Sequence, residues 1–230
     1  MNAKRTLIQT VVLWAVVLLP AVVQAQFTFI TNNGAITITG YTGYPTTLTI
    51  PSATNNLNVV SIGDSAFSNQ TNLTSVTISG SNLTNIGNSA FSYCSKLGSF
   101  TFPTSVKSIG DSAFYGCSNI TSVAFAGPSS TLTNISSSAF SHCSKLGGNF
   151  LMPNTVTSLG TNVFSYDTNL TGFSFGSSSP TSVGDNMFYG CSALNNSYYG
   201  SITFPTSVKS IGDSAFYGCS NITSVAFAGP

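Results

Sequence analysis

The sequence predicts a repeat solenoid, a coil of stacked short units with parallel β-strands, and three observations support this. A unit of 23 to 28 residues recurs along the chain with a phenylalanine as its clearest anchor. Within each unit, apolar and polar residues alternate over a short stretch, which is typical of a strand with one face turned inward. A single unit of this size cannot bury its own apolar side, whereas stacked units bury one continuous core.

Seven copies of the unit follow one another, and their anchors are separated by 24, 23, 26, 24, 24 and 28 residues. A Leu or Ile stands six residues after every anchor. One block is copied without change, since residues 101–128 are identical to residues 203–230, which indicates a recent duplication within the gene. The anchors are Phe67, Phe91, Phe114, Phe140, Phe164, Phe188 and Phe216.

Each unit contains a predicted strand and a predicted turn. Alternating residues such as Phe100-Thr101-Phe102 predict the strand, and Pro103 ends it because proline cannot donate a ladder hydrogen bond. The Ile-Gly-Asp-Ser-Ala-Phe stretch at 109–114 predicts a turn that leads into a short helical segment. Its Gly permits unusual φ angles, and Asp or Ser caps free N–H groups.

Two segments precede the repeats. Residues 1–25 are predicted to be a cleaved signal peptide, with Lys4 and Arg5 before an apolar run and a small-residue site that ends at Ala25. The alternative is a permanent membrane anchor, for which the apolar run is short. Residues 26–47 are predicted to be a β-rich lead-in that caps the coil. Residues 48–230 are predicted to form the solenoid of seven repeats, and its C-terminal end is expected to be uncapped.

The composition argues against several classes of partner. Only 5% of the residues are charged, compared with about 25% in ordinary globular proteins. Cleavage after Ala25 removes Lys4 and the only Arg, which leaves four Lys against five Asp and a formal charge of −1. Binding to nucleic acid or to anionic lipid needs clustered basic residues, so neither partner is expected.

The five cysteines all occupy one position of the repeat. An odd number cannot form a complete disulfide framework, and we predict a structural ladder of buried thiols. No C-x-x-C spacing is present, so a zinc site is not expected, and neither is any other metal or cofactor. The ladder consists of Cys94, Cys117, Cys143, Cys191 and Cys219.

No catalytic residue is predicted. His142 is the only histidine, and because other units have Asn, Tyr or Gly at its position, we interpret this position as exposed and unconstrained. Asp185 and Asp213 lie in consecutive units, so a glycan hydrolase with paired carboxylates is a minor alternative. Other units carry Asn88 or Ser137 at the same position, and this exchange indicates a capping role.

The pattern of the unit resembles the BspA-like (treponemal-type) leucine-rich repeats. The stretches Val106-Lys-Ser-Ile-Gly-Asp-Ser-Ala-Phe and Cys117-Ser-Asn-Ile-Thr-Ser-Val-Ala-Phe carry this resemblance, which extends from about residue 48 to the end. Gln70 and Asp167 depart from it at the Cys position, and Ser136 departs from it at the Gly position. The resemblance implies a right-handed solenoid with a parallel sheet on its concave side and a secreted or surface-exposed protein.

We therefore expect a secreted or cell-surface scaffold without enzymatic activity that binds a protein or a glycan, with adhesion as one such role. The candidate binding residues are Tyr198 and Tyr199, which lie in the largest insertion. The main alternative is a structural element that assembles with other copies through its C-terminal rung. Insertion into the membrane after signal cleavage is not expected.

Overall fold

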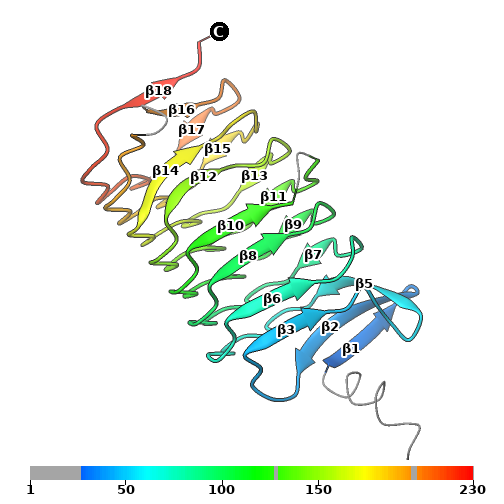
Figure 1. Cartoon of the computed structure of the whole chain (residues 1–230). Helices are drawn as coiled ribbons and strands as arrows, with labels where there is room; N and C mark the ends of the chain where they lie inside the picture. Colours follow the sequence, from blue (N-terminus) through cyan, green and yellow to red (C-terminus); the bar gives the residue numbers. More distant parts are fainter. Residues whose placement is uncertain (1–26, 127–128, 198–200, 230) are drawn as a thin grey trace, which may run out of the picture.

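The computed structural model describes residues 27–126, 129–197 and 201–229 and shows one long coil of short strands (Figure 1). The predicted solenoid of short parallel strands is confirmed. Successive strands of each column belong to successive turns of the coil, which we call rungs. Each rung is held to the next by backbone hydrogen bonds on several sides.

One column of strands forms a sheet with the order β1-β2-β5-β7-β9-β11-β13. β4 pairs antiparallel with the first two residues of β5, Leu57 and Asn58. All pairs from β2 onward along this order are parallel. β15 and β17 form a further parallel pair. The bounds are β1 Phe27–Asn32, β2 Ala35–Tyr41, β4 Ala53–Thr54, β5 Leu57–Ile62, β7 Asn85–Ile86, β9 Ser108–Ile109, β11 Asn134–Ile135, β13 Ser158–Leu159, β15 Ser182–Val183 and β17 Ser210–Ile211.

The second column is divided into parallel pairs that do not join into one sheet. β3 (Thr47–Ile50) pairs with β6 (Ser75–Ile78), and β8 (Ser99–Phe102) pairs with β10 (Ser122–Phe125). β12 (Gly148–Leu151) pairs with β14 (Leu170–Ser174), and β16 (Ile202–Phe204) pairs with β18 (Val225–Phe227). This column therefore opens between pairs, notably between β10 and β12.

The N-terminal lead-in is a hairpin that lies against the first rung. β1 and β2 are antiparallel, and Asn33 and Gly34 turn between them with φ of 49° and 74°, as a two-residue hairpin requires. β2 continues the column by pairing with β5. The Phe27 ring lies 6.4 Å from the first anchor ring, Phe67, at 90°. The hairpin thus covers the apolar side of the first rung.

The anchors form the centre of the core. Their rings stack face to face from rung to rung, with neighbouring centroids 5.2 to 5.7 Å apart and interplanar angles of 7° to 22°. Inward strand residues such as Phe100 and Phe173 pack against this stack at steeper angles. One continuous core therefore runs the length of the described coil.

The prediction of short helical segments is wrong, because the described residues contain only strands, turns and bends. The reason is visible around Phe114. Ser112 and Gly116, two residues before and after this anchor, have φ of 54° and 70°. Left-handed residues at this spacing interrupt any right-handed helix. The segment bonds to its neighbour instead, since the Phe91 N–H donates to the Ala113 carbonyl over 2.7 Å.

Candidate functional site

The five cysteines lie inside the coil as buried free thiols. Each Sγ donates a hydrogen bond of 2.9 to 3.2 Å to the carbonyl of the anchor in the preceding rung, as Cys143 does to Phe114. Burial raises the pKa of Cys117 and Cys143 well above 9.0, and it raises the pKa of Cys219 to about 11. These thiols are therefore protonated and poor nucleophiles at neutral pH.

Asp64, Asp111 and Asp185, which stand three residues before their anchors, cap the backbone of the following rung. Asp64 Oδ1 accepts a hydrogen bond from the Asn88 N–H over 2.7 Å. In the same way Asp185 Oδ1 accepts from the Asp213 N–H over 2.9 Å, so one member of the candidate hydrolase pair binds the backbone of the other. Among the described residues, no three His, Cys or Asp side chains gather where a metal ion would fit.

The predicted binding residues Tyr198 and Tyr199 lie outside the described residues, so their role stays a prediction. A different aromatic cluster does emerge when the rungs stack. We call it the aromatic stripe, and it contains one ring from each of six consecutive rungs. Successive ring centroids are 5.3, 5.1, 4.6, 5.3 and 5.0 Å apart. The stripe consists of Tyr93, Tyr115, His142, Tyr166, Tyr189 and Tyr217.

Each ring of the stripe comes from one of two neighbouring positions. In three rungs it follows the anchor directly, and the next residue is then glycine, as in Tyr115-Gly116. In the other three it stands two residues after the anchor, and the residue before it is then serine, as in Ser92-Tyr93. The glycine leaves room for the adjacent ring, because a Cβ on Gly116 would lie 2.8 Å from Tyr93 Cδ1.

The structure corrects the interpretation of His142 as exposed and unconstrained. The residue two after the anchor has a positive φ in all seven rungs, from 59° at Tyr93 to 77° at Gly218. His142 itself is half-buried between Tyr115 and Tyr166, and its ring stacks on Tyr166 at 4.6 Å and 20°. Burial lowers the pKa of His142 from its ordinary value, so this ring is neutral at pH 7.

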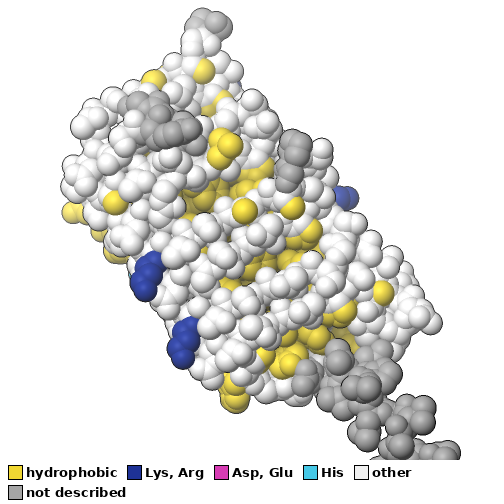
Figure 2. All heavy atoms as spheres, viewed as in Figure 1, with side chains coloured by type: hydrophobic (Ala, Val, Ile, Leu, Met, Phe, Trp, Pro, Cys, Tyr) yellow, Lys and Arg dark blue, Asp and Glu magenta, His cyan; other side chains and the backbone are white. Residues whose placement is uncertain are grey.

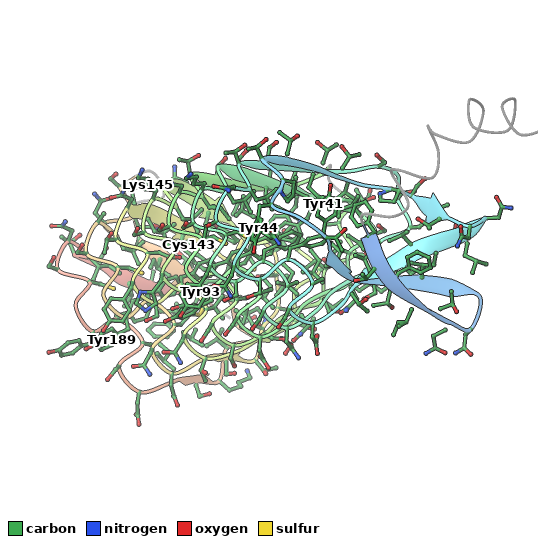
Figure 3. The ribbon with its side chains drawn as sticks, turned by 90° about the horizontal axis from the view of Figure 1, so that it is seen from below. Tyr41, Tyr44, Tyr93, Cys143, Lys145 and Tyr189 are labelled. Carbon is green, nitrogen blue, oxygen red and sulfur yellow. The ribbon has the colours of Figure 1, made fainter. Side chains whose placement is uncertain are left out.

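The stripe lies on the surface of the coil. Tyr93 is 51% exposed, Tyr166 is 43% exposed and Tyr217 is 65% exposed. In Figure 3, Tyr189 lies at the edge of the coil and Cys143 lies inside its outline. Sequence reasoning missed the stripe because its rings are distributed over two positions of the repeat. The pairing of Tyr with Gly and of Ser with Tyr or His was nevertheless a readable signal.

Columns of polar side chains flank the stripe in sequence. Three residues before the anchors stand Asp64, Asn88, Asp111, Ser137, Thr161, Asp185 and Asp213. Four residues after them stand Thr71, Ser95, Ser118, Ser144, Thr168, Ser192 and Ser220. The face in Figure 2 is likewise almost uncharged, with Lys side chains at its margins and a band of apolar side chains along the coil. The molecule thus offers rings, hydroxyls and amides far more than charges.

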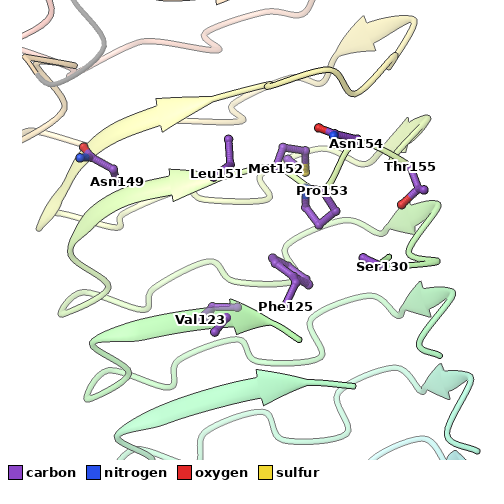
Figure 4. A pocket seen from close by; sticks show the side chains of 10 residues that line it. Val123, Phe125, Ser130, Asn149, Leu151, Met152, Pro153, Asn154 and Thr155 are labelled. Carbon is purple, nitrogen blue, oxygen red and sulfur yellow. The ribbon is translucent and has the colours of Figure 1, made fainter. Parts of the chain in front are cut away.

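A groove of about 340 Å³ lies where the second column opens between β10 and β12 (Figure 4). Its lining includes Val123, Phe125 and Leu151, of which Leu151 is 56% exposed. Asn149 and Asn154 add amide groups. The lining contains no titratable side chain, so the groove can bind an apolar or amide group but cannot supply acid–base chemistry.

Comparison with known families agrees with this geometry. The sequence profile of the BspA type leucine-rich repeat region matches residues 60–195 and 192–229 in six copies. The chain belongs to the BspA-type leucine-rich repeat family. The match includes every rung of the aromatic stripe, so the stripe lies on repeats of this family. The resemblance drawn from the Cys and Phe spacing is confirmed.

Solved structures share the fold. A leucine-rich repeat protein of T. pallidum is 26% identical with a TM-score of 0.76, and the match covers 86% of this chain and 89% of that one. A leucine-rich repeat protein from Bacteroides ovatus is 29% identical with a TM-score of 0.74, over 89% of this chain and 52% of that one. No curated protein matches the sequence significantly. Within the described ranges, no helix has the length and apolar character needed to cross a membrane.

Proposed function

We propose that this BspA-type protein is a scaffold without enzymatic activity that works outside the cell or on its surface and binds an extracellular partner along the aromatic stripe. One observation carries the proposal: six aromatic rings line the surface of a coil whose core is already filled by the anchor stack. Half-exposed tyrosines of this kind are favoured in binding surfaces, because they offer a large apolar area together with a hydroxyl.

The environments of the reactive groups support a binding role over a catalytic one. The thiols donate to carbonyl groups inside the core, and Asp64, Asp111 and Asp185 accept backbone N–H groups through their carboxylates. These groups are engaged in holding the rungs together. The family match is to a repeat family, and neither similar structure is described by a catalytic activity.

Export is part of the proposal. The signal peptide expected at residues 1–25 would direct the chain out of the cytoplasm, leaving Gln26 as the first residue. The low charge and the many hydroxyl and amide side chains suit a partner that is met outside the cell.

The test is a binding assay with the chain from Gln26 onward. Biolayer interferometry against purified extracellular polysaccharides and matrix proteins should give saturable binding to at least one of them. The double variant Tyr93→Asn/Tyr166→Asn should bind that partner at least tenfold more weakly. Asn is chosen because Asn69 occupies the same position of the first rung with φ of 61°.

The matched control is Tyr44→Asn, which removes a tyrosine that is 77% exposed and lies outside the stripe. This variant should bind as tightly as the unchanged protein. Equal affinity of the double variant and the control would show that the stripe is not the binding surface.

A further inference from the structure

We infer that the ligand of the aromatic stripe is a neutral, extended, β-1,4-linked polysaccharide of the cellulose or chitin type, lying along the coil with one sugar against each rung. This inference rests on the proposed binding function and names the chemistry of the partner. Spacing, ring orientation and charge support it separately.

The spacing of the rings suits a chain of pyranose units. The centroids follow one another every 4.6 to 5.3 Å, because each rung contributes one ring and rungs are separated by about 4.7–4.9 Å, the distance between paired strands. An extended β-1,4-linked chain advances by one pyranose ring over nearly the same distance. A polypeptide does not match it, since a strand advances about 3.3 Å per residue and a polyproline II helix about 3.1 Å.

The orientation of the rings suits the two kinds of surface on a sugar. Three of the five neighbouring pairs are tilted, at 73°, 59° and 60°. The other two, His142 with Tyr166 and Tyr189 with Tyr217, are stacked at 20° and 19°. The planes of the rings therefore change direction along the stripe, and the rings do not form one continuous stack. The C–H face of a pyranose packs on an aromatic ring, and its equatorial hydroxyls can bond to the phenol groups of the stripe.

The charges near the stripe favour a neutral ligand. Three residues before the anchors, four of the seven positions are aspartates, and their carboxylates would repel a polyanion such as a nucleic acid or a sulfated glycan. Five residues after the anchors, Lys96 and Lys145 are the only charged residues, and the other rungs carry Asn or Ala there. These fourteen positions together carry four carboxylates and two ammonium groups. His142 adds no charge at neutral pH, because burial lowers its pKa.

Affinity electrophoresis in native gels tests the inference with the chain from Gln26 onward. Hydroxyethylcellulose in the gel should retard the protein, whereas soluble starch should not, because its α-linked chain coils and cannot follow a straight stripe. Hyaluronate should not retard it either, because its carboxylates are repelled. In calorimetric titrations, cellohexaose should bind at least tenfold more tightly than cellotriose, since a longer chain contacts more rungs.

Stripe variants complete the test. Tyr93→Asn and Tyr166→Asn should each weaken retardation at least fivefold, whereas Tyr44→Asn should not change it. Tyr166→His keeps a ring of the kind that His142 already supplies, and this variant should keep the binding. Circular dichroism and thermal melting verify that each variant is folded.

The inference is overturned if the folded, unchanged chain is not retarded by hydroxyethylcellulose and does not bind chitohexaose. It is also overturned if retardation persists in a folded Tyr93→Asn/Tyr166→Asn variant. Stripe-dependent binding to a matrix protein, without any glycan binding, would retain the proposed function and reject the glycan. Absence of every stripe-dependent interaction would reject both.

Discussion

Asp167 Oδ1 accepts a hydrogen bond from the backbone N–H of Cys143 over 2.8 Å, inside the core. Its second oxygen, Oδ2, is buried without a hydrogen-bond partner among the described residues, and the residue is 0% exposed. Asp167 stands where five other rungs place a thiol that donates to a carbonyl. An ionised carboxylate cannot donate, and burial raises the pKa of Asp167 well above 3.8.

Replacing this carboxyl with the thiol of the ladder should stabilise the protein. We expect Asp167→Cys to raise the free energy of unfolding by about 1–3 kcal/mol, because it removes a buried oxygen that lacks a partner. The Cys143 N–H keeps its bond of 3.2 Å to the Phe140 carbonyl. Urea denaturation followed by circular dichroism measures the change. A lower midpoint for this variant would contradict the explanation.

Asp167 should also make stability depend on pH. Its pKa is raised in the folded state, so its contribution to stability is fully present below about pH 4, the pKa of an unfolded Asp. That contribution is lost as the pH rises through the folded pKa, with a slope of up to about 1.4 kcal/mol per pH unit. Asp167→Asn removes the titration. The unfolding free energy of the unchanged protein should therefore fall relative to this variant from pH 5 to pH 8, and parallel curves would disprove it.

The buried thiols should react little with thiol reagents while the protein is folded. Burial raises the pKa of Cys117, Cys143 and Cys191, and each thiol donates to a carbonyl. Ellman's reagent at pH 8 should therefore label less than about one thiol per native chain, and all five after denaturation in guanidinium. Cys219 should be labelled first, since it is 6% exposed and the other four cysteines are 0% exposed. Fast labelling of several thiols in folded protein would exclude a sealed core.

Replacing Gly116, which lies next to the Tyr93 ring, should destabilise the protein. Gly116→Ala places a Cβ 2.8 Å from Tyr93 Cδ1 at a residue with φ of 70°, and we expect a loss of about 1–3 kcal/mol in unfolding free energy. Gly98→Ala is the matched control, because its Cβ would meet nothing closer than 3.6 Å and its φ is not positive. Thermal melts of both variants make the comparison. Equal midpoints would show that the ring can move aside.

Much of this fold could be predicted from the sequence, because the repeat records it several times over. The interval between anchors predicted the length of each rung. The alternation Phe100-Thr101-Phe102 predicted a strand, and its two phenylalanines are buried. The buried position of the cysteines followed from their place in the repeat. Such patterns are local, so each copy supports the same assignment.

The remaining features depend on how the rungs stack. Ser112 and Asn162 are not glycines, yet both have a positive φ, which lets the turn segment bond to the next rung where the sequence suggested a helix. No local propensity signals that choice. The aromatic stripe likewise exists only between rungs, because Tyr115 and His142 are neighbours in space but 27 residues apart in the chain.

The identical blocks 101–128 and 203–230 carry a further consequence. Each block brings one anchor and one stripe ring, Tyr115 in the first and Tyr217 in the second. Copying such a block within the gene adds one rung, and the new anchor continues the existing core. Gain or loss of such a block would therefore lengthen or shorten the coil and its aromatic stripe in whole steps of one rung.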